Sequence, residues 1–276
     1  HPAGEALTML RVDARGAVVF ATLDAPATRN ALSDAMVAGL VDALAQAESQ
    51  ADTRALVIQG AGGTFCAGGD FSGFRALMAQ PVPSHGVDPI VGFNRSFGAL
   101  LERLQSSPVA TIAVVEGAAM GGGAGLAAAC DVVLASTTAQ FGTPEVTLGL
   151  PPAQIAPFIA ARLGHHAALR LLLTGRRLSA PQALACGLAD EVHEGAALDA
   201  RLAGLLAELG RAEPAALRAT KAILQRRRSE PLAATLDHAA RAFAHALRSG
   251  TAAEGLAALT GKRPAAWVVT PDEGKR

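Results

Sequence analysis

Two glycine-rich turns are the first residues in this chain that could do chemistry. Each follows an apolar run: 55–59 leads into 66–70 (Cys-Ala-Gly-Gly-Asp), and 109–115 leads into 117–125. Such a run predicts a buried strand, and glycines let backbone N–H groups approach a ligand closely. Two N–H groups from separate loops, aimed at one point, stabilise negative charge developing on an oxygen. Ordinary glycine turns and close helix–strand packing are the alternative explanations.

The second turn also allows another interpretation. Residues 121–123 follow a strand and open a helix, where N–H groups and the helix dipole favour an anion. Residues 123–128 match a relaxed dinucleotide fingerprint, with Glu145 where a ribose-binding acid would stand. Dinucleotide folds place that fingerprint after their first strand, however, and here several elements precede it. The dinucleotide hypothesis also leaves 66–70 unexplained.

Glu145 is the candidate acid–base group. It follows Pro144 and precedes the apolar Val146 and Leu148. Apolar surroundings raise the pKa of a carboxyl group by desolvation, which suits general acid–base catalysis near neutral pH. A glutamate in the first turn of a helix, after a proline, is the structural alternative.

Composition limits the class of protein. Half of the 276 residues are hydrophobic, and 24 Lys and Arg balance 24 Asp and Glu, so net charge does not indicate a nucleic-acid or membrane partner. Three cysteines without metal-like or disulfide-like spacing predict reduced thiols in a cytoplasmic protein, and no metal site is expected. Residues 1–4 show no secretory signal. The apolar stretch 117–130 is shorter than a membrane span of about 20 residues.

The pattern along the chain predicts an α/β core followed by helices. We expect a hairpin around Gly16, a helix over 34–48 capped by Ser33, and a loop over 78–90 that could act as a lid. Alternating strands (55–59, 109–115, 131–135) and helices (90–105, 121–130) favour parallel βαβ units. Beyond 152, apart from a short strand at 190–193, the expected elements are helices over 152–163, 165–173, 180–186, 198–209, 214–227, 231–248 and 251–260.

Taken together, four segments resemble the crotonase superfamily of enoyl-CoA hydratases and isomerases. They are 25–33, 65–70, 117–123 and 141–152, in the family's order, and the similarity covers about residues 8–264. The resemblance implies a ββα spiral core over 1–197 and a C-terminal helical domain over 198–276 that caps the CoA and forms oligomers. It also implies a homotrimer or a dimer of trimers. Coenzyme A would enter as part of the acyl-CoA substrate, without a further cofactor.

The resemblance also assigns roles to residues. Gly69 and Gly122 would donate the two N–H groups of an oxyanion hole to the thioester oxygen, and Glu145 would be the catalytic acid–base group. Lys262 would reach the CoA phosphates, often from a neighbouring subunit in this family. The other residues expected beside the substrate are Arg29, Ala31, Ala67, Gly68, Asp70, Gly121, Gly125, Pro144 and Pro152. Asp70 is expected to cap the next helix rather than to act as an acid.

The chain departs from the family pattern at Gly125. Hydratases that use two glutamates have the first one there, so the standard two-carboxylate mechanism is excluded. We expect Gly125 to leave empty volume that could admit a branched or carboxylated acyl group. Pro152 likewise replaces a familiar glycine.

The segment 148–158 resembles bacterial methylglutaconyl- and isohexenylglutaconyl-CoA hydratases, which favours hydration by Glu145 alone. Double-bond isomerisation and thioester hydrolysis remain alternatives. A non-catalytic member that binds acyl-CoA, or RNA through 226–228, is the alternative from another class.

Overall fold

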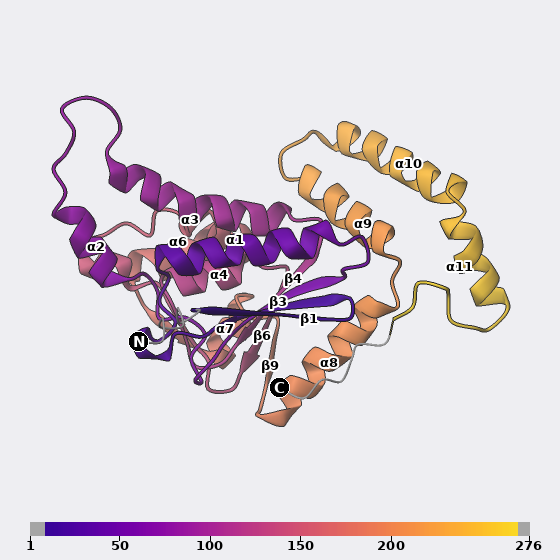
Figure 1. Cartoon of the computed structure of the whole chain (residues 1–276), viewed down its shortest axis with the longest axis horizontal. Coiled ribbons are helices and arrows are strands. Elements are labelled where there is room, and N and C mark those ends of the chain that lie inside the picture. The colour runs from indigo at the N-terminus through magenta and orange to yellow at the C-terminus, as the bar shows by residue number, and fades with distance from the viewer. Residues whose placement is uncertain (1–8, 270–276) are drawn as a thin grey trace, which may run out of the picture.

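A six-stranded sheet forms the centre of the computed structural model, which describes residues 9–269 (Figure 1). The prediction about residues 1–4 lies outside these residues. The strand order is β1-β2-β3-β4-β6-β9, with β1 antiparallel to β2 and all other neighbours parallel. The strands are β1 (Leu10–Arg15), β2 (Val18–Leu23), β3 (Ala55–Gly60), β4 (Ala110–Val115), β6 (Val132–Ser136) and β9 (Glu191–His193). The predicted hairpin and parallel units are confirmed.

Helices cover both faces of this sheet. On one face, α1 (Asp34–Ser49), α3 (Pro89–Ser106) and α4 (Gly122–Ala129) pack over side chains such as Leu56 and Ile58. On the other face, α8 (Ala196–Gly210) packs its leucines over the alternate strand residues, among them Val57. Successive strand residues point to opposite faces, and because helices cover both faces, every position of β2 is buried. This burial explains the continuous apolar runs.

Local signals fix the helices that carry the site. Ser33 Oγ accepts a hydrogen bond from Met36 N at 3.2 Å and caps α1, as predicted. The Asp88 carboxylate accepts from Ile90 N at 2.9 Å and caps α3, which begins at Pro89. Between α2 (Phe71–Met78) and α3, residues 79–88 form the expected loop, which projects from the body in Figure 1.

A second, three-stranded sheet was not predicted. β7 (Gln140–Gly142) pairs with both β5 (Ala118–Met120) and β8 (Arg177–Ser179). The glycine-rich stretch 117–125 is therefore not one uninterrupted turn, because β5 lies within it. Three-residue strands show too little alternation for recognition in a sequence, and tertiary pairing creates them.

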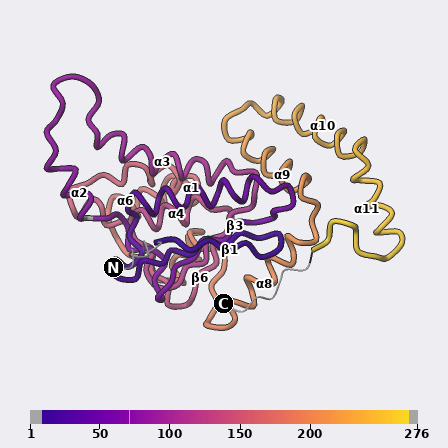
Figure 2. The backbone as a smooth tube through the Cα atoms, viewed as in Figure 1, coloured from indigo at the N-terminus to yellow at the C-terminus, as the bar shows by residue number. Residues whose placement is uncertain are grey.

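Helices dominate the rest of the chain, as predicted. They are α5 (Ala156–Leu163), α6 (His165–Thr174), α7 (Ala180–Cys186), α9 (Pro214–Arg226), α10 (Leu232–Arg248) and α11 (Thr251–Thr260). Two short 3-10 helices are η1 (Pro26–Thr28) and η2 (Pro144–Leu148). The first predicted helix was expected at 152 and begins at 156. In Figure 2, α10 and α11 lead away from the sheet, whereas α8 packs on it and α9 contacts its end, where Lys221 Nζ donates to Val109 O at 2.8 Å. The domain division at 197/198 stays a prediction.

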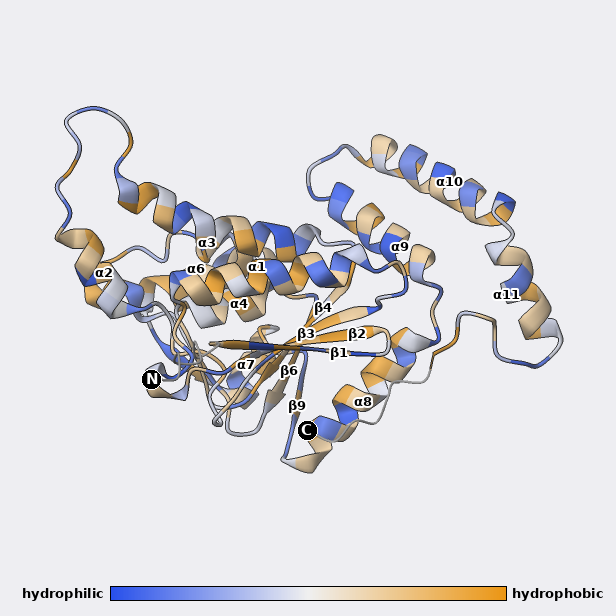
Figure 3. Ribbon diagram, viewed as in Figure 1, coloured by the Kyte–Doolittle hydropathy of each residue, from blue (hydrophilic) through white to orange (hydrophobic). Residues whose placement is uncertain are grey.

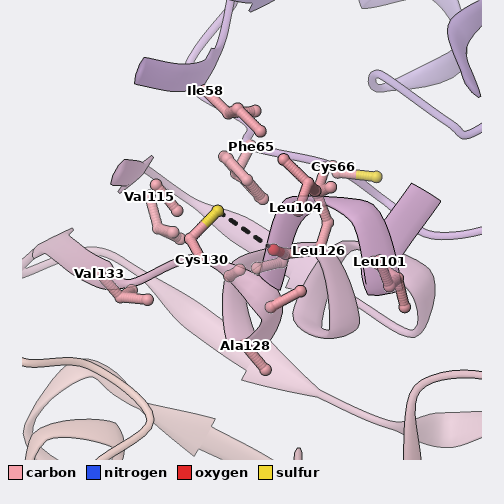
Figure 4. Close-up of a cluster of buried hydrophobic side chains, with 14 of the residues drawn as sticks. Ile58, Phe65, Cys66, Leu101, Leu104, Val115, Leu126, Ala128, Cys130 and Val133 are labelled. Atoms are coloured by element: carbon pink, nitrogen blue, oxygen red, sulfur yellow. Dashed lines mark hydrogen bonds between the residues drawn. The ribbon is translucent and has the colours of Figure 1, made fainter. Parts of the chain in front are cut away.

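Two cysteines belong to the core rather than to a reactive site. Figure 4 shows Cys66 and Cys130 among buried side chains, and the Cys130 thiol donates to the Leu126 carbonyl at 3.4 Å. Burial raises the pKa of each thiol to about 12. Both are therefore protonated near neutral pH and act as packing groups. Within residues 9–269, no helix is long and apolar enough to cross a membrane.

Candidate active site

The two glycine-rich turns lie side by side because their backbones are hydrogen-bonded to each other. Cys66 N donates to Ala118 O at 2.9 Å, and Met120 N donates to Cys66 O at 2.9 Å. Just beyond this pairing, Gly68 has a φ of 106° and Gly121 a φ of 52°, conformations that L side chains rarely adopt. A Cβ at Gly68 would lie 3.0 Å from Met120 O. Both glycines are therefore needed for the close approach of the two turns.

A third loop, residues 25–32, is hydrogen-bonded to the first glycine-rich turn. Ala67 N donates to Arg29 O at 3.0 Å, and Leu32 N donates to Gly68 O at 2.8 Å. Asn30, fully buried, donates from Nδ2 to Ala61 O at 3.0 Å and accepts at Oδ1 from Ala25 N at 2.9 Å. The predicted contact residues Arg29 and Ala31 thus lie on this supporting loop, and Asn30, not singled out from the sequence, fixes it. Asn30 has a left-handed backbone (φ 59°), as Arg29 before it does (φ 53°), and its buried amide is revealed only by the structure.

Gly69 and Gly122 present the two N–H groups proposed for an oxyanion hole. Within residues 9–269, neither N–H group has a hydrogen-bond partner. Gly122 is the first residue of α4, where backbone N–H groups have no intrahelical acceptor and the helix dipole is positive. Gly69 belongs to the turn before α2. Free donors on adjacent turns can bind a developing oxyanion.

Glu145 lies against the same turns. A Cβ built on Gly121 would be 2.8 Å from Glu145 Oε1 and 3.9 Å from Gly68 Cα, so the carboxyl group and both turns meet at Gly121. Pro144 starts η2, which carries Glu145. Glu145 Oε2 is buried, without a hydrogen-bond partner in the described part of the chain. Burial raises the pKa of this carboxyl group, as its apolar neighbours predicted.

Asp70, the other acid at these turns, has a different environment. Its Oδ1 accepts from Ser72 N at 2.9 Å and from Ser72 Oγ at 2.6 Å, and it caps α2 as expected. These hydrogen bonds, the one from the Ser72 hydroxyl above all, lower the pKa of Asp70. A carboxylate with a lowered pKa and satisfied bonds is poorly suited to carry protons. Glu145 is therefore the stronger acid–base candidate.

Apolar side chains lie beside Gly69 and Gly122. A Cβ on Gly69 would lie 2.5 Å from Phe74 Cζ, and a Cβ on Gly122 would lie 2.8 Å from Leu32 Cδ1 and 3.4 Å from the Phe97 ring. Phe74 also contacts Phe93 edge-to-face, with ring centroids 5.8 Å apart. The sequence analysis did not single out these aromatic residues. They give the site an apolar wall that suits an acyl chain.

The expectation that Gly125 leaves empty volume is wrong. Gly125 is buried, and a Cβ there would lie 2.2 Å from Ile155 Cγ2 and 2.7 Å from Ile155 Cβ. Ile155 itself is 4% exposed. Its side chain therefore fills the space expected to be open. Pro152 lies in the turn leading to Ile155, and its carbonyl accepts from Ala156 N at 3.0 Å.

Other predicted residues lie apart from these turns. Lys262 is exposed in the turn after α11, with a φ of 50°, and no contact within residues 9–269 joins it to the glycine turns. Arg226 Nη1 contacts Glu230 Oε1 at 2.7 Å, an ordinary pair one helical turn apart. The described residues contain no group of three His, Cys, Asp or Glu that could hold a metal.

Comparison with known proteins agrees with this fold and identifies the family. The sequence model of the enoyl-CoA hydratase/isomerase family matches residues 13–269. Among solved structures, an enoyl-CoA hydratase/isomerase from Marinobacter aquaeolei superposes with a TM-score of 0.91 at 39% identity, over 95% of this chain and 99% of its own. Fold and sequence together place the chain in the crotonase superfamily.

A further solved structure and a sequence relative show the same family. Pseudomonas aeruginosa AtuE superposes with a TM-score of 0.89 at 43% identity, over 95% of this chain and all of its own. The Escherichia coli 2,3-dehydroadipyl-CoA hydratase is 32% identical over 96% of this chain and 98% of its own length. The chain belongs to the enoyl-CoA hydratase/isomerase family.

Proposed function

We propose that this protein adds water to the conjugated double bond of an α,β-unsaturated acyl-CoA thioester. The observation that carries the proposal is the position of Glu145. Its carboxyl group lies at Gly121, where the turn bearing Gly69 meets the turn bearing Gly122, and within residues 9–269 both N–H groups are free. An acid beside two free donors suits a reaction in which charge grows on an oxygen while a proton moves at nearby carbons.

In this mechanism the thioester oxygen accepts hydrogen bonds from Gly69 N and Gly122 N. Glu145 carboxylate orients a water molecule and takes its proton while the water oxygen bonds to the β-carbon. The electron pair of the double bond moves onto the thioester oxygen, giving an enolate. Glu145 then returns the proton to the α-carbon, so water is added and the carboxylate is regenerated. Each oxyanion donor contributes about 3–4 kcal/mol in enzymes where one was removed.

The acyl chain that the substrate carries is a separate question from the reaction. The Escherichia coli relative is named for hydration of a CoA ester, which supports water addition. The segment 148–158 still resembles hydratases of branched glutaconyl-CoA esters, but Ile155 fills the space that was to hold a branch. We therefore propose hydration of an enoyl-CoA and leave the acyl chain to a substrate panel.

Oligomer formation is also proposed. α10 and α11 lie away from the sheet, and Figure 3 shows both hydrophobic and hydrophilic segments along them. Exposed apolar side chains on these helices are Leu232, Leu236, Phe243, Leu247, Leu256 and Leu259. Neighbouring copies that cover them would give the homotrimer, or dimer of trimers, that the resemblance implies. Lys262 would then meet the CoA phosphates of a neighbouring subunit, in a cytoplasmic enzyme.

Double-bond isomerisation is the second candidate. Gly125 leaves Glu145 without a second carboxylate on the adjacent turn of α4, and one carboxylate suffices to carry a proton from one carbon to another. The free N–H groups would stabilise the same enolate. Water would then take no part in the reaction.

A panel of crotonyl-CoA, a 3-enoyl-CoA and a branched glutaconyl-CoA distinguishes these functions. Loss of the conjugated-enoyl absorbance of crotonyl-CoA, with the hydroxyacyl product found by mass spectrometry, supports hydration. Appearance of that absorbance from the 3-enoyl ester without a gain of mass supports isomerisation. Binding of all three esters without turnover would refute both and favour the non-catalytic alternative.

A further inference from the structure

The space beside Gly125 is filled by Ile155, a residue from outside α4. Gly121 and Gly125 are stacked on α4, because Gly125 N donates to Gly121 O at 3.1 Å. Gly121 contacts Glu145, and Gly125 contacts Ile155, the residue before α5. A continuous path of contacts therefore runs from the Glu145 carboxyl group to the Ile155 side chain.

The direction of helical side chains places Ile155 on the side of Gly125 that faces Gly121. Helical Cα–Cβ bonds tilt toward the N-terminus, so a side chain at 125 would point toward Gly121 and the site. Ile155 Cγ2 occupies that place, 2.2 Å from the position of a residue-125 Cβ. The branched, apolar side chain of Ile155, which is 4% exposed, therefore stands where a side chain at position 125 of α4 would otherwise stand.

We propose that Ile155 is a specificity-determining residue that limits the bulk of the acyl group on the α4 side of the site. This inference rests on the proposed enoyl-CoA chemistry and adds the residue that selects among acyl groups. The fixed Ile155 surface favours an unbranched β-carbon and excludes an alkyl branch directed at α4. Packing of this kind discriminates by about tenfold to two-hundredfold for each methylene group.

Three variants test the proposal with crotonyl-CoA and its β-methyl-branched homologue. Ile155→Gly removes the side chain, and we expect the ratio of kcat/KM for the branched ester to that for crotonyl-CoA to rise about tenfold or more. Ile155→Val is the matched control, because valine keeps both Cγ atoms, and its ratio should stay within about threefold of wild type. Loss of packing alone would lower both rates together and would not move the ratio.

The third variant restores a side chain to the space that Ile155→Gly empties. In Gly125→Ala/Ile155→Gly, the two atoms nearest the new Cβ, Ile155 Cγ2 and Cβ, are removed, and the Cα of residue 155 stays at 3.5 Å, an ordinary contact. Its ratio should fall back toward the wild-type value. Gly125→Ala alone should lower the Tm, because its Cβ meets Ile155 Cγ2, and the double variant should recover part of that loss. Ile155→Ala would not serve for this rescue, since its Cβ would still be 2.7 Å away.

The outcomes separate this inference from the proposed function. An active Ile155→Gly enzyme with an unchanged ratio refutes the role of Ile155 and leaves the enoyl-CoA chemistry intact. A wild-type Tm for Gly125→Ala refutes the packing on which the inference rests. Absence of turnover of either ester by the wild-type protein refutes the proposed function, and the specificity role with it.

Discussion

Replacing Glu145 by glutamine tests the proposed acid–base group most directly. The amide has the size of the carboxyl group but neither accepts nor returns a proton. General acid–base groups contribute about 10²–10⁴-fold, so kcat should fall by that factor, which is about 3–5 kcal/mol in the barrier. Binding of the CoA ester should change little, because the donors Gly69 N and Gly122 N are untouched.

The same variant should lose activity but not stability at high pH. Burial raises the pKa of Glu145 in the folded state above its unfolded value of about 4.3. Stability from this group is therefore fully present below the unfolded pKa and is lost as pH rises through the folded pKa. Once the pH exceeds the folded pKa, the protein holds a poorly solvated carboxylate. Glu145→Gln removes that charge, so its free energy of unfolding at pH 8 should equal or exceed that of wild type.

Initial rates with crotonyl-CoA and urea unfolding at pH 5 and 8 measure both effects. Glu194→Gln is the matched control, because Glu194 is exposed and its side chain has no partner within residues 9–269. It should change neither rate nor stability. The wild-type acidic limb of kcat/KM should also lie above the ordinary glutamate range. Wild-type turnover by Glu145→Gln would refute the catalytic assignment, and a large stability loss at pH 8 would refute the desolvation argument.

Further predictions concern the turns and the exposed helices. Gly122→Ala places a Cβ 2.8 Å from Leu32 Cδ1 and disturbs a proposed oxyanion donor, so kcat should fall about 10²–10³-fold. Gly92→Ala is the control, because a Cβ on Gly92 meets nothing within 4 Å, and an equal loss of kcat in that variant would contradict the assignment. Asn30→Ala removes buried hydrogen bonds and should cost about 2–4 kcal/mol in urea unfolding, and an unchanged midpoint would show that the loop is held otherwise. Phe243→Glu should shift the oligomer toward monomer in light scattering, and a wild-type mass would exclude α10 as the interface.

Much of the architecture could be predicted because its signals are local. Ser33 before an amphipathic run indicated α1, and the loop glycines indicated turns with backbone conformations closed to other residues. The direction of the pKa shift of Glu145 was also predicted, from the apolar Val146 and Leu148 that follow it, and burial raises that pKa in the structure. Such features depend on a few adjacent residues, so a sequence can specify them.

Other features could not be predicted, because they depend on contacts between distant segments. Three-residue strands such as β5 form only when β7 lies beside them. Asn30 was part of a resembling motif, yet its role as a buried link between loops required the positions of Ala25 and Ala61. The aromatic wall formed by Phe74 and Phe97 likewise depends on how α2 and α3 pack over the turns.

By itself, the sequence determined the family, the layered α/β fold and the identity of the turns and acid proposed to react, since these follow from residue type and local spacing. Tertiary structure alone decided what lies beside that acid. A glycine at 125 signals a missing side chain, but whether the space is open depends on where residues thirty positions later pass. Ile155 packs into that space because buried volume in a protein interior is filled by whichever side chain the fold brings there.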